Sequence, residues 1–453
     1  MGTRNNQVLQ FLFALLSLFM LLGLLNSCQS VGRGPRETLP EKVRPRGAPR
    51  NIDKAVKENP RENLPHLIEY IRENSETESE KFRYAHDWVA QNVAYDVGAL
   101  RGKSRKVTDA YGVLQYGKSV CAGYSNALQL LCDQLGLECV TISGYGRGAS
   151  FDPYGEEQME GPKSNHAWNA VKLEGKWYLV DVTWNSGYVR NGKFEPNFNH
   201  HYYKIPPRQF AYRHLPLEEQ WQLLDEPLDF KSFIAQPLLR GRFFTYGFSL
   251  SENYQKITPV EGSEYQLQFR GGKEMLMSAR LEPYANQGSE IEGYDMVSRD
   301  GEGVHAVRVR FPEPGKYRLK VFAKHQSERG SYRSLGSFYF EAENAAGVED
   351  QAQDGSREVP PFPKVYGRFK EAGISNLQPD EGVLPRGERR RFSFSTNERA
   401  EYYLYAGNYG RFPFELNKES GLYELETSLQ GSEVHLSKKV NNRFYHLAKY
   451  QLE

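Results

Sequence analysis

A change in hydrophobic patterning near residue 235 most constrains how this 453-residue chain folds. Before it, apolar residues recur at three- and four-residue spacing, which is typical of amphipathic helices, and short strand-like runs separate the helical stretches. After it, apolar and polar residues alternate with a period of two, which is typical of half-buried strands. The pattern predicts an α+β chain in which a mixed helix–strand domain precedes an all-β part.

The composition excludes several classes of protein. Hydrophobic residues make up 39% of the chain and aromatic residues 13%, which excludes wholesale disorder. The 58 basic and 57 acidic residues leave a net charge of +1, so we expect no nucleic-acid partner. Four cysteines in 453 residues cannot form a disulfide scaffold. All five tryptophans lie between Trp88 and Trp221, and this uneven distribution points to the first part of the chain as the place of a functional site.

The N-terminal segment predicts export. An apolar run over 11–25 is shorter than the roughly 20 residues of a membrane-spanning helix and has the length of a signal-peptide core. It ends in Leu25-Asn-Ser-Cys28, which resembles the lipobox of bacterial lipoproteins. The resemblance implies that residues 1–27 are a signal peptide and that Cys28 carries a lipid anchor in the cell membrane or outer membrane. An ordinary secretory signal with an incidental cysteine is the alternative.

Residues 28–50 are predicted to be a Pro- and Arg-rich tether. Between 31 and 50 there are six basic residues, two acidic residues and four prolines, a composition that stays extended. The basic excess would either contact anionic lipid headgroups or form a solvated spacer.

Residues 51–235 are predicted to form one domain. The spacing of apolar residues predicts helices over 63–72 and 78–95, and a third helix that begins near Cys121 and ends at Gly136. Glycine, serine and charged residues predict a loop over 98–119. A strand is expected over 138–144.

A hairpin is predicted around Glu174-Gly175, between strand-like runs over 168–173 and 176–184. A two-residue turn sets the register so that His166 and Asp181 lie on the same face as diagonal cross-strand neighbours. At a Cα separation of about 7–8 Å, the carboxylate would then reach the imidazole.

Cys121, His166 and Asp181 together fit thiol acyl transfer. A helix N-terminus lowers the pKa of a cysteine thiol, a histidine stabilises the thiolate and moves protons, and a carboxylate orients the histidine. Asp181 lies between apolar strand residues, where an unpaired carboxylate is costly. Cys132 and Cys139 lack such a setting and are expected to be buried core residues.

Six segments of this domain form recognisable blocks: Asp87–Asp96, Ser119-Val-Cys-Ala-Gly-Tyr-Ser125, Ser164-Asn-His-Ala-Trp-Asn-Ala-Val171, Gly175-Lys-Trp-Tyr-Leu-Val-Asp-Val-Thr-Trp-Asn185, His201–Pro206 and Trp221–Leu224. At these residues the sequence resembles the transglutaminase-like superfamily, in its kyphoscoliosis-peptidase-like branch. The resemblance covers about residues 80–235 and implies a papain-like fold, with Cys121 as nucleophile, His166 as general base and acid, and Asp181 as the orienting carboxylate.

No cofactor or metal site is predicted. Gly144–Gly148 lacks the spacing of a phosphate loop. His200-His201 has no Cys or Asp nearby at ligand spacing. Residues 236–345 and 363–453 are predicted to be two β-sandwich, immunoglobulin-like modules joined by a linker over 346–362, and the role of the modules is open.

The sequence predicts an exported, lipid-anchored cysteine peptidase or amidase that forms a thioester on Cys121. Water would then give hydrolysis and a lysine amine would give transfer, and the sequence leaves both open. The expected substrate is a protein or peptide, with components of the cell envelope among the candidates. The alternative is a non-catalytic surface scaffold that binds a partner or a glycan through the same domains.

Overall fold

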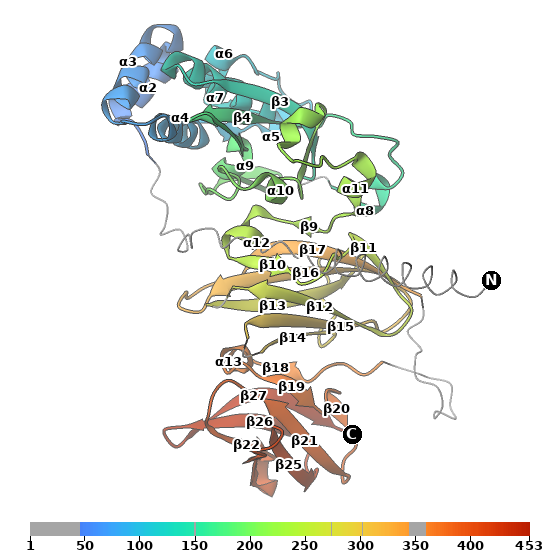
Figure 1. Ribbon diagram of the computed structural model, residues 1–453. Coiled ribbons are helices and arrows are strands. Elements are labelled where there is room, and N and C mark those ends of the chain that lie inside the picture. Colours follow the sequence, from blue (N-terminus) through green and yellow to red (C-terminus); the bar gives the residue numbers. More distant parts are fainter. Residues whose placement is uncertain (1–45, 149–150, 273, 301, 344–358) are drawn as a thin grey trace, which may run out of the picture. The chain divides into compact units, whose positions relative to one another are not determined.

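The computed structural model describes residues 46–453 except 149–150, 273, 301 and 344–358 (Figure 1). The expected signal peptide, Cys28 and most of the expected linker therefore lie outside the described residues. The described part of the expected tether, residues 46–50, is packed on the domain: Arg46 donates its backbone N–H to Asp87 at 3.0 Å, and a helix begins at Arg50. Within the described ranges, no helix combines the length and the hydropathy that crossing a bilayer requires.

Helices and short strands alternate up to residue 235, followed by strands with a few short helices (Figure 1). The helical elements of the first part are α2 (Arg50–Glu58), α3 (Pro60–Glu73), α4 (Glu78–Asn92), α5 (Val97–Leu100), α6 (Ala110–Tyr116), α7 (Cys121–Leu135), α8 (Pro153–Glu156), α9 (Val182–Ser186), α10 (Pro207–Phe210), η1 (Glu219–Gln222) and α11 (Phe230–Ala235). Its strands are β1 (Ala94–Tyr95), β2 (Lys118–Ser119), β3 (Cys139–Gly146), β4 (His166–Leu173), β5 (Lys176–Val180), β6 (Gly187–Arg190), β7 (Lys193–Pro196) and β8 (His214–Pro216).

Capping residues set the bounds of the two helices that matter most. The Thr77 hydroxyl accepts the backbone N–H of Glu80 at 3.1 Å and so starts α4. Helix α7 begins at Cys121, and Gly136 caps its C-terminal end after Leu135 with a left-handed φ of 77°, a conformation that favours glycine. The predicted bounds of α7 are therefore confirmed.

Two of the local predictions are wrong. The helix expected to reach residue 95 ends at Asn92, because Ala94–Tyr95 forms a strand parallel to Lys118–Ser119. The loop expected over 98–119 contains α5, α6 and β2. Asp109 starts α6 by accepting the backbone N–H of Gly112 at 2.8 Å, a capping signal that the loop-like composition concealed.

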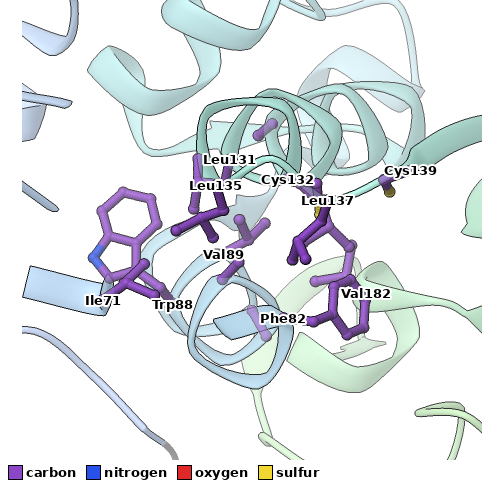
Figure 2. Packing of buried hydrophobic residues seen from close by; sticks show 14 of the residues in the cluster. Ile71, Phe82, Trp88, Val89, Leu131, Cys132, Leu135, Leu137, Cys139 and Val182 are labelled. Atoms are coloured by element: carbon purple, nitrogen blue, oxygen red, sulfur yellow. The ribbon is translucent and has the colours of Figure 1, made fainter. Parts of the chain in front are cut away.

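The core of this domain lies between α4 and α7 (Figure 2). Phe82, Trp88 and Val89 of α4 face Leu131 and Leu135 of α7, and all five side chains are buried. This packing holds the helix that carries Cys121 against the rest of the domain.

Cys132 and Cys139 belong to the same core, and both are free, buried cysteines, as predicted (Figure 2). Deleting a large side chain from such a core costs about 2–5 kcal/mol of folding free energy.

An antiparallel sheet in the order β5-β4-β3-β8 packs against α7. Leu173 pairs with Lys176 across Glu174-Gly175, so the predicted two-residue turn and its register are confirmed. Both turn residues have left-handed φ values, 46° and 79°, as this kind of hairpin turn requires. The second strand, expected to run to residue 184, ends at Val180.

The β part holds two separate hydrophobic cores. The first lies between a sheet in the order β10-β12-β15-β14 and another in the order β11-β17-β16-β13, with β9 paired to β17. Its elements are β9 (Leu238–Leu239), α12 (Gly241–Thr245), β10 (Phe248–Leu250), β11 (Ile257–Val260), β12 (Glu264–Gly271), β13 (Met275–Pro283), β14 (Asp295–Arg299), β15 (Val304–Arg310), β16 (Gly315–His325) and β17 (Arg333–Ala342).

The second core lies between a sheet in the order β18-β27-β26-β22-β23, with β20 paired to β27, and one in the order β19-β21-β25-β24. Its elements are β18 (Lys364–Val365), α13 (Gly367–Glu371), β19 (Ser375–Gln378), β20 (Val383–Leu384), β21 (Arg389–Ser395), β22 (Glu401–Tyr405), η2 (Gly407–Tyr409), β23 (Arg411–Pro413), β24 (Glu415–Leu416), β25 (Tyr423–Ser428), β26 (Glu433–Val440) and β27 (Arg443–Leu452). Two sheets around one core are the arrangement of a β-sandwich.

Candidate active site

Three chain segments that are distant in sequence bring the predicted site residues together. Cys121 is the first residue of α7, and its side chain remains partly exposed. His166 is the first residue of β4, and Asp181 follows directly after β5. The structure therefore places the thiol at a helix N-terminus, where backbone N–H groups lack intrahelical partners and lower the pKa of a nearby thiol.

Asp181 reaches His166 from a helix cap and not from the strand position that the sequence predicted. Its Oδ1 accepts the backbone N–H of Trp184 at 2.9 Å and so starts α9. Its Oδ2 lies 2.7 Å from His166 Nε2. The predicted contact is present, but the strand ends at Val180, one residue before Asp181, because the Asp181 carboxylate caps the helix that follows.

The ring of His166 is oriented for proton transfer to and from the thiol. Because Nε2 contacts Asp181, the other ring nitrogen, Nδ1, is left for Cys121. Burial raises the pKa of the Cys121 thiol, but a hydrogen bond and the charge from His166, together with the backbone N–H of Ala167, outweigh burial and lower the pKa overall.

The charges of the site match those of an ion pair. Burial lowers the pKa of His166, but the Asp181 carboxylate and Cys121 outweigh burial and raise the pKa to about 10. Burial raises the pKa of Asp181, and its two histidine neighbours, His166 and His214, lower it well below its usual range. The lowered pKa of Cys121 and the raised pKa of His166 both favour a thiolate beside an imidazolium.

Aromatic and glycine residues fix the imidazole in place. Trp184 stacks on the His166 ring with centroids 4.8 Å apart and planes 21° apart. Gly146 also lies so close that a Cβ atom there would be 2.8 Å from the Cβ of His166. A side chain at residue 146 would therefore displace the histidine.

The sequence did not predict His214, the first residue of β8, at this site. Its Nε2 lies 3.0 Å from Asp181 Oδ2, the same oxygen that contacts His166. The ring is buried, and burial is the main cause that lowers its pKa to about 4. Strand β8 pairs with β3, with Gly146 opposite His214, and this pairing places His214 beside Asp181. The sequence spacing does not predict the pairing.

A second carboxylate with two histidines, Asp87, lies on α4. Asp87 Oδ1 lies 2.8 Å from His86 Nδ1 and 2.8 Å from His200 Nε2. Its Oδ2 accepts from Arg83 Nε at 2.7 Å. The sequence has no Asp at ligand spacing from His200, and this contact forms because the fold closes a gap of 113 residues that spacing rules do not cover.

Donor atoms in each of the two clusters lie within 4.8 Å of one another, which is close enough to hold a metal ion. In both clusters, however, the carboxylate accepts hydrogen bonds from imidazole nitrogens at 2.7–3.0 Å. The Arg83 guanidinium also supplies the positive charge at Asp87. The donor sets therefore fit hydrogen-bonded clusters better than metal ligand sets.

Comparisons with known proteins agree with the order of domains. Residues 65–182 match the transglutaminase-like superfamily, and residues 230–350 match the KY-like, immunoglobulin-like domain. The chain thus contains a transglutaminase-like domain followed by an immunoglobulin-like domain. Cys121, His166 and Asp181 all fall within the first match, whereas His200 and His214 lie beyond its end.

Curated relatives match part of this chain at low identity, and the chain spans less than half of their own length. The chain is 27% identical over 267 residues to kyphoscoliosis peptidase of Mus musculus, which covers 58% of this chain and 39% of the mouse protein. It is 26% identical over 292 residues to Hillarin of Drosophila melanogaster, covering 57% of this chain and 34% of Hillarin. Among solved structures, a crystal structure of a TGase aligns over 32% of this chain and 34% of its own, with 19% identity and a TM-score of 0.21.

Proposed function

We propose that this protein is an exported, lipid-anchored thiol enzyme that cleaves amide bonds through a thioester on Cys121. The observation that carries the proposal is the His166–Asp181 contact of 2.7 Å beside a thiol whose pKa is lowered at the start of α7. The match of residues 65–182 to the transglutaminase-like superfamily and the similarity to kyphoscoliosis peptidase support the same conclusion.

In the first step, the Cys121 thiolate attacks the carbonyl carbon of the amide, and a C–S bond forms. The backbone N–H groups at the start of α7 stabilise the oxyanion. The His166 imidazolium then protonates the leaving amine as the C–N bond breaks, which leaves a thioester and a neutral imidazole.

In the second step, the neutral imidazole accepts a proton from water, and the hydroxide attacks the thioester carbonyl. The C–S bond breaks, a carboxylic acid leaves, and the thiolate–imidazolium pair is restored. A lysine amine in place of water would give an isopeptide bond by the same route. We propose hydrolysis as the main outcome, with a protein or peptide of the cell envelope as substrate.

Alkylation by iodoacetamide tests the nucleophile without requiring a known substrate. At pH 6 an ordinary thiol is protonated and reacts slowly, whereas a histidine-paired thiolate reacts fast. We expect rapid modification of Cys121, followed residue by residue with mass spectrometry. Cys132 and Cys139, which are buried in the same domain, serve as internal controls and should stay unmodified.

A trap for the thioester completes the test. Wild-type protein incubated with cell-envelope extract should carry an acyl adduct on Cys121 that hydroxylamine releases, and Cys121→Ala should carry none. Slow alkylation of Cys121 at pH 6 together with no adduct would overturn the proposal and favour a non-catalytic scaffold.

The lipid anchor is tested separately. Expression with a clickable fatty-acid analogue should label the wild-type chain and place it in the membrane fraction, as expected from the motif Leu25-Asn-Ser-Cys28. Cys28→Ala should lose both properties. Equal labelling of the two proteins would contradict the anchor and leave the enzyme proposal untouched.

A further inference from the structure

His214 stands out because it contacts the site carboxylate and has no role in the reaction steps above. Asp181 Oδ2 accepts from His166 Nε2 at 2.7 Å and lies 3.0 Å from His214 Nε2. The remaining oxygen, Oδ1, is held by the backbone N–H of Trp184 at 2.9 Å. One carboxylate oxygen therefore serves two imidazoles, and the carboxylate cannot rotate without losing the Trp184 contact.

The His214 ring is held firmly by its neighbours. It stacks on Phe210 with centroids 3.9 Å apart and planes 25° apart, and it meets Trp168 edge-on at 5.0 Å. Trp184, which also covers His166, lies 4.4 Å from it. A neutral imidazole carries a single N–H, and both ring nitrogens face acceptors: Nδ1 lies 3.3 Å from the backbone carbonyl oxygen of Phe210, and Nε2 lies 3.0 Å from the carboxylate. The shorter contact with the charged acceptor assigns the hydrogen to Nε2.

The charged groups around His214 keep its ring neutral. Asp181 favours a proton on His214, but His166 and Arg213 disfavour a second positive charge, and burial disfavours any charge. His166 faces Asp181, Cys121 and His214. Asp181 thus accepts one charged and one neutral N–H at the same oxygen.

We propose that His214 is a positioning residue that acts through Asp181: its neutral N–H takes up part of the carboxylate charge and so limits how tightly Asp181 holds the proton on His166. This inference rests on the proposed function. An imidazolium that binds its proton less tightly is a stronger acid toward the leaving amine. The contact would therefore speed the first step of the reaction.

The test compares variants that keep or remove the N–H donor. His214→Gln places an amide N–H near the position of Nε2, His214→Met has a similar shape without a donor, and His214→Phe keeps an aromatic ring without a donor. For each variant the rate of Cys121 alkylation by iodoacetamide is measured from pH 5 to 11. The lower inflection reports the thiol and the upper inflection reports loss of the proton from His166.

We expect the upper inflection of His214→Met and His214→Phe to lie about 1 pH unit above that of the wild type, and that of His214→Gln to lie near it. Titration of ¹⁵N-labelled histidine by NMR gives the same pKa directly. Unchanged upper inflections in the folded donor-free variants, or a Gln variant that behaves like Met, would overturn the inference. If neither donor-free variant folds, a wild-type NMR spectrum without a proton on His214 Nε2 would also overturn it.

The same measurements keep this inference apart from the proposed function. If the wild type itself lacks fast alkylation at pH 6 and forms no acyl adduct, the enzyme proposal fails. If the wild type reacts fast but the Gln and Met variants have the same profile, only the role of His214 fails.

Discussion

Asp181 and Asp87 are both buried carboxylates that accept hydrogen bonds from two histidines at one oxygen. The two clusters differ in where the positive charge resides. At Asp87 the cation is Arg83, which stays protonated at any physiological pH. At Asp181 the cation is the His166 imidazolium, which is able to release its proton. The second oxygen of Asp181 receives a neutral backbone N–H instead of an arginine.

The comparison suggests that a carboxylate paired with a permanently charged cation has a structural role, whereas a carboxylate paired with a titratable cation supports proton transfer. His86 shows the structural case: its Nδ1 donates to Asp87, its Nε2 accepts from Asn185 at 3.0 Å, and burial lowers its pKa, so it is uncharged in the fold. His166 has the opposite shift and lies beside a thiol. Helix α9 joins the clusters, because Asp181 starts it and Asn185 lies within it.

The largest expected effect is a difference between Asp181 and Asp87 in the rate of thioester formation after substitution. Asp181→Asn removes the charge that holds the proton on His166, and we expect the rate of thioester formation to fall about 10³–10⁴-fold. The measurement is single-turnover acylation followed by mass spectrometry. Asp87→Asn is the matched control, and the rate of its folded fraction should stay within about 3-fold of the wild type. Equal losses in both variants would remove the distinction between the two clusters.

The next largest expected effect is a difference between Asp87→Asn and Asp181→Asn in the free energy of unfolding. Asp87→Asn leaves the partly exposed Arg83 beside a neutral amide, and we expect a loss of at most about 3 kcal/mol of the free energy of unfolding, the lower end for breaking a buried pair. Urea denaturation followed by tryptophan fluorescence measures the loss. Asp181→Asn should cost less, because its backbone contact with Trp184 can persist through the amide oxygen. A larger loss for Asp181→Asn would contradict the structural role assigned to Asp87.

The pH dependence of stability should differ in sign between the clusters. The pKa of His86 is lowered in the fold, so the unfolded chain takes up the proton first and stability falls as pH falls below about 6.5. The pKa of His166 is raised to about 10, so its contribution is complete below about 6.5 and is lost as pH rises toward 10.

Urea midpoints measured from pH 5 to 10 check this prediction. His86→Gln should flatten the acidic side of the profile and His166→Gln the alkaline side. A change on the same side in both variants would show that the two histidines do not carry opposite shifts.

The sequence predicted what depends on local pattern. The start of α7 at Cys121, its end at Gly136 and the turn at Glu174-Gly175 follow from capping and turn chemistry that neighbouring residues determine. The His166–Asp181 contact followed from the turn, although its route through a helix cap did not. The residues around Asp181 give no sign that it caps a helix, because the whole run 176–184 has the pattern of one strand.

Long-range pairings explain what the sequence did not predict. His214 reaches Asp181 only because β8 pairs with β3, and His200 reaches Asp87 across 113 residues. Each is a single histidine with no partner at a recognisable spacing. Such residues can be recognised as part of a site only after the fold has placed two distant segments side by side.

The smallest expected effect measures the connection between the clusters. Asn185 donates to His86 Nε2 at 3.0 Å and accepts the backbone N–H of Tyr202 at 2.9 Å, so it ties α9 to α4. A double-mutant cycle with His86→Phe and Asn185→Leu should give a coupling of about 1 kcal/mol in the free energy of unfolding. Both single variants should also shift the upper inflection of Cys121 alkylation by less than removal of the His214 N–H, because they move α9 and leave Asp181 and its donors in place. A coupling near zero, with additive losses, would mean that the two clusters are independent and that α9 transmits nothing between them.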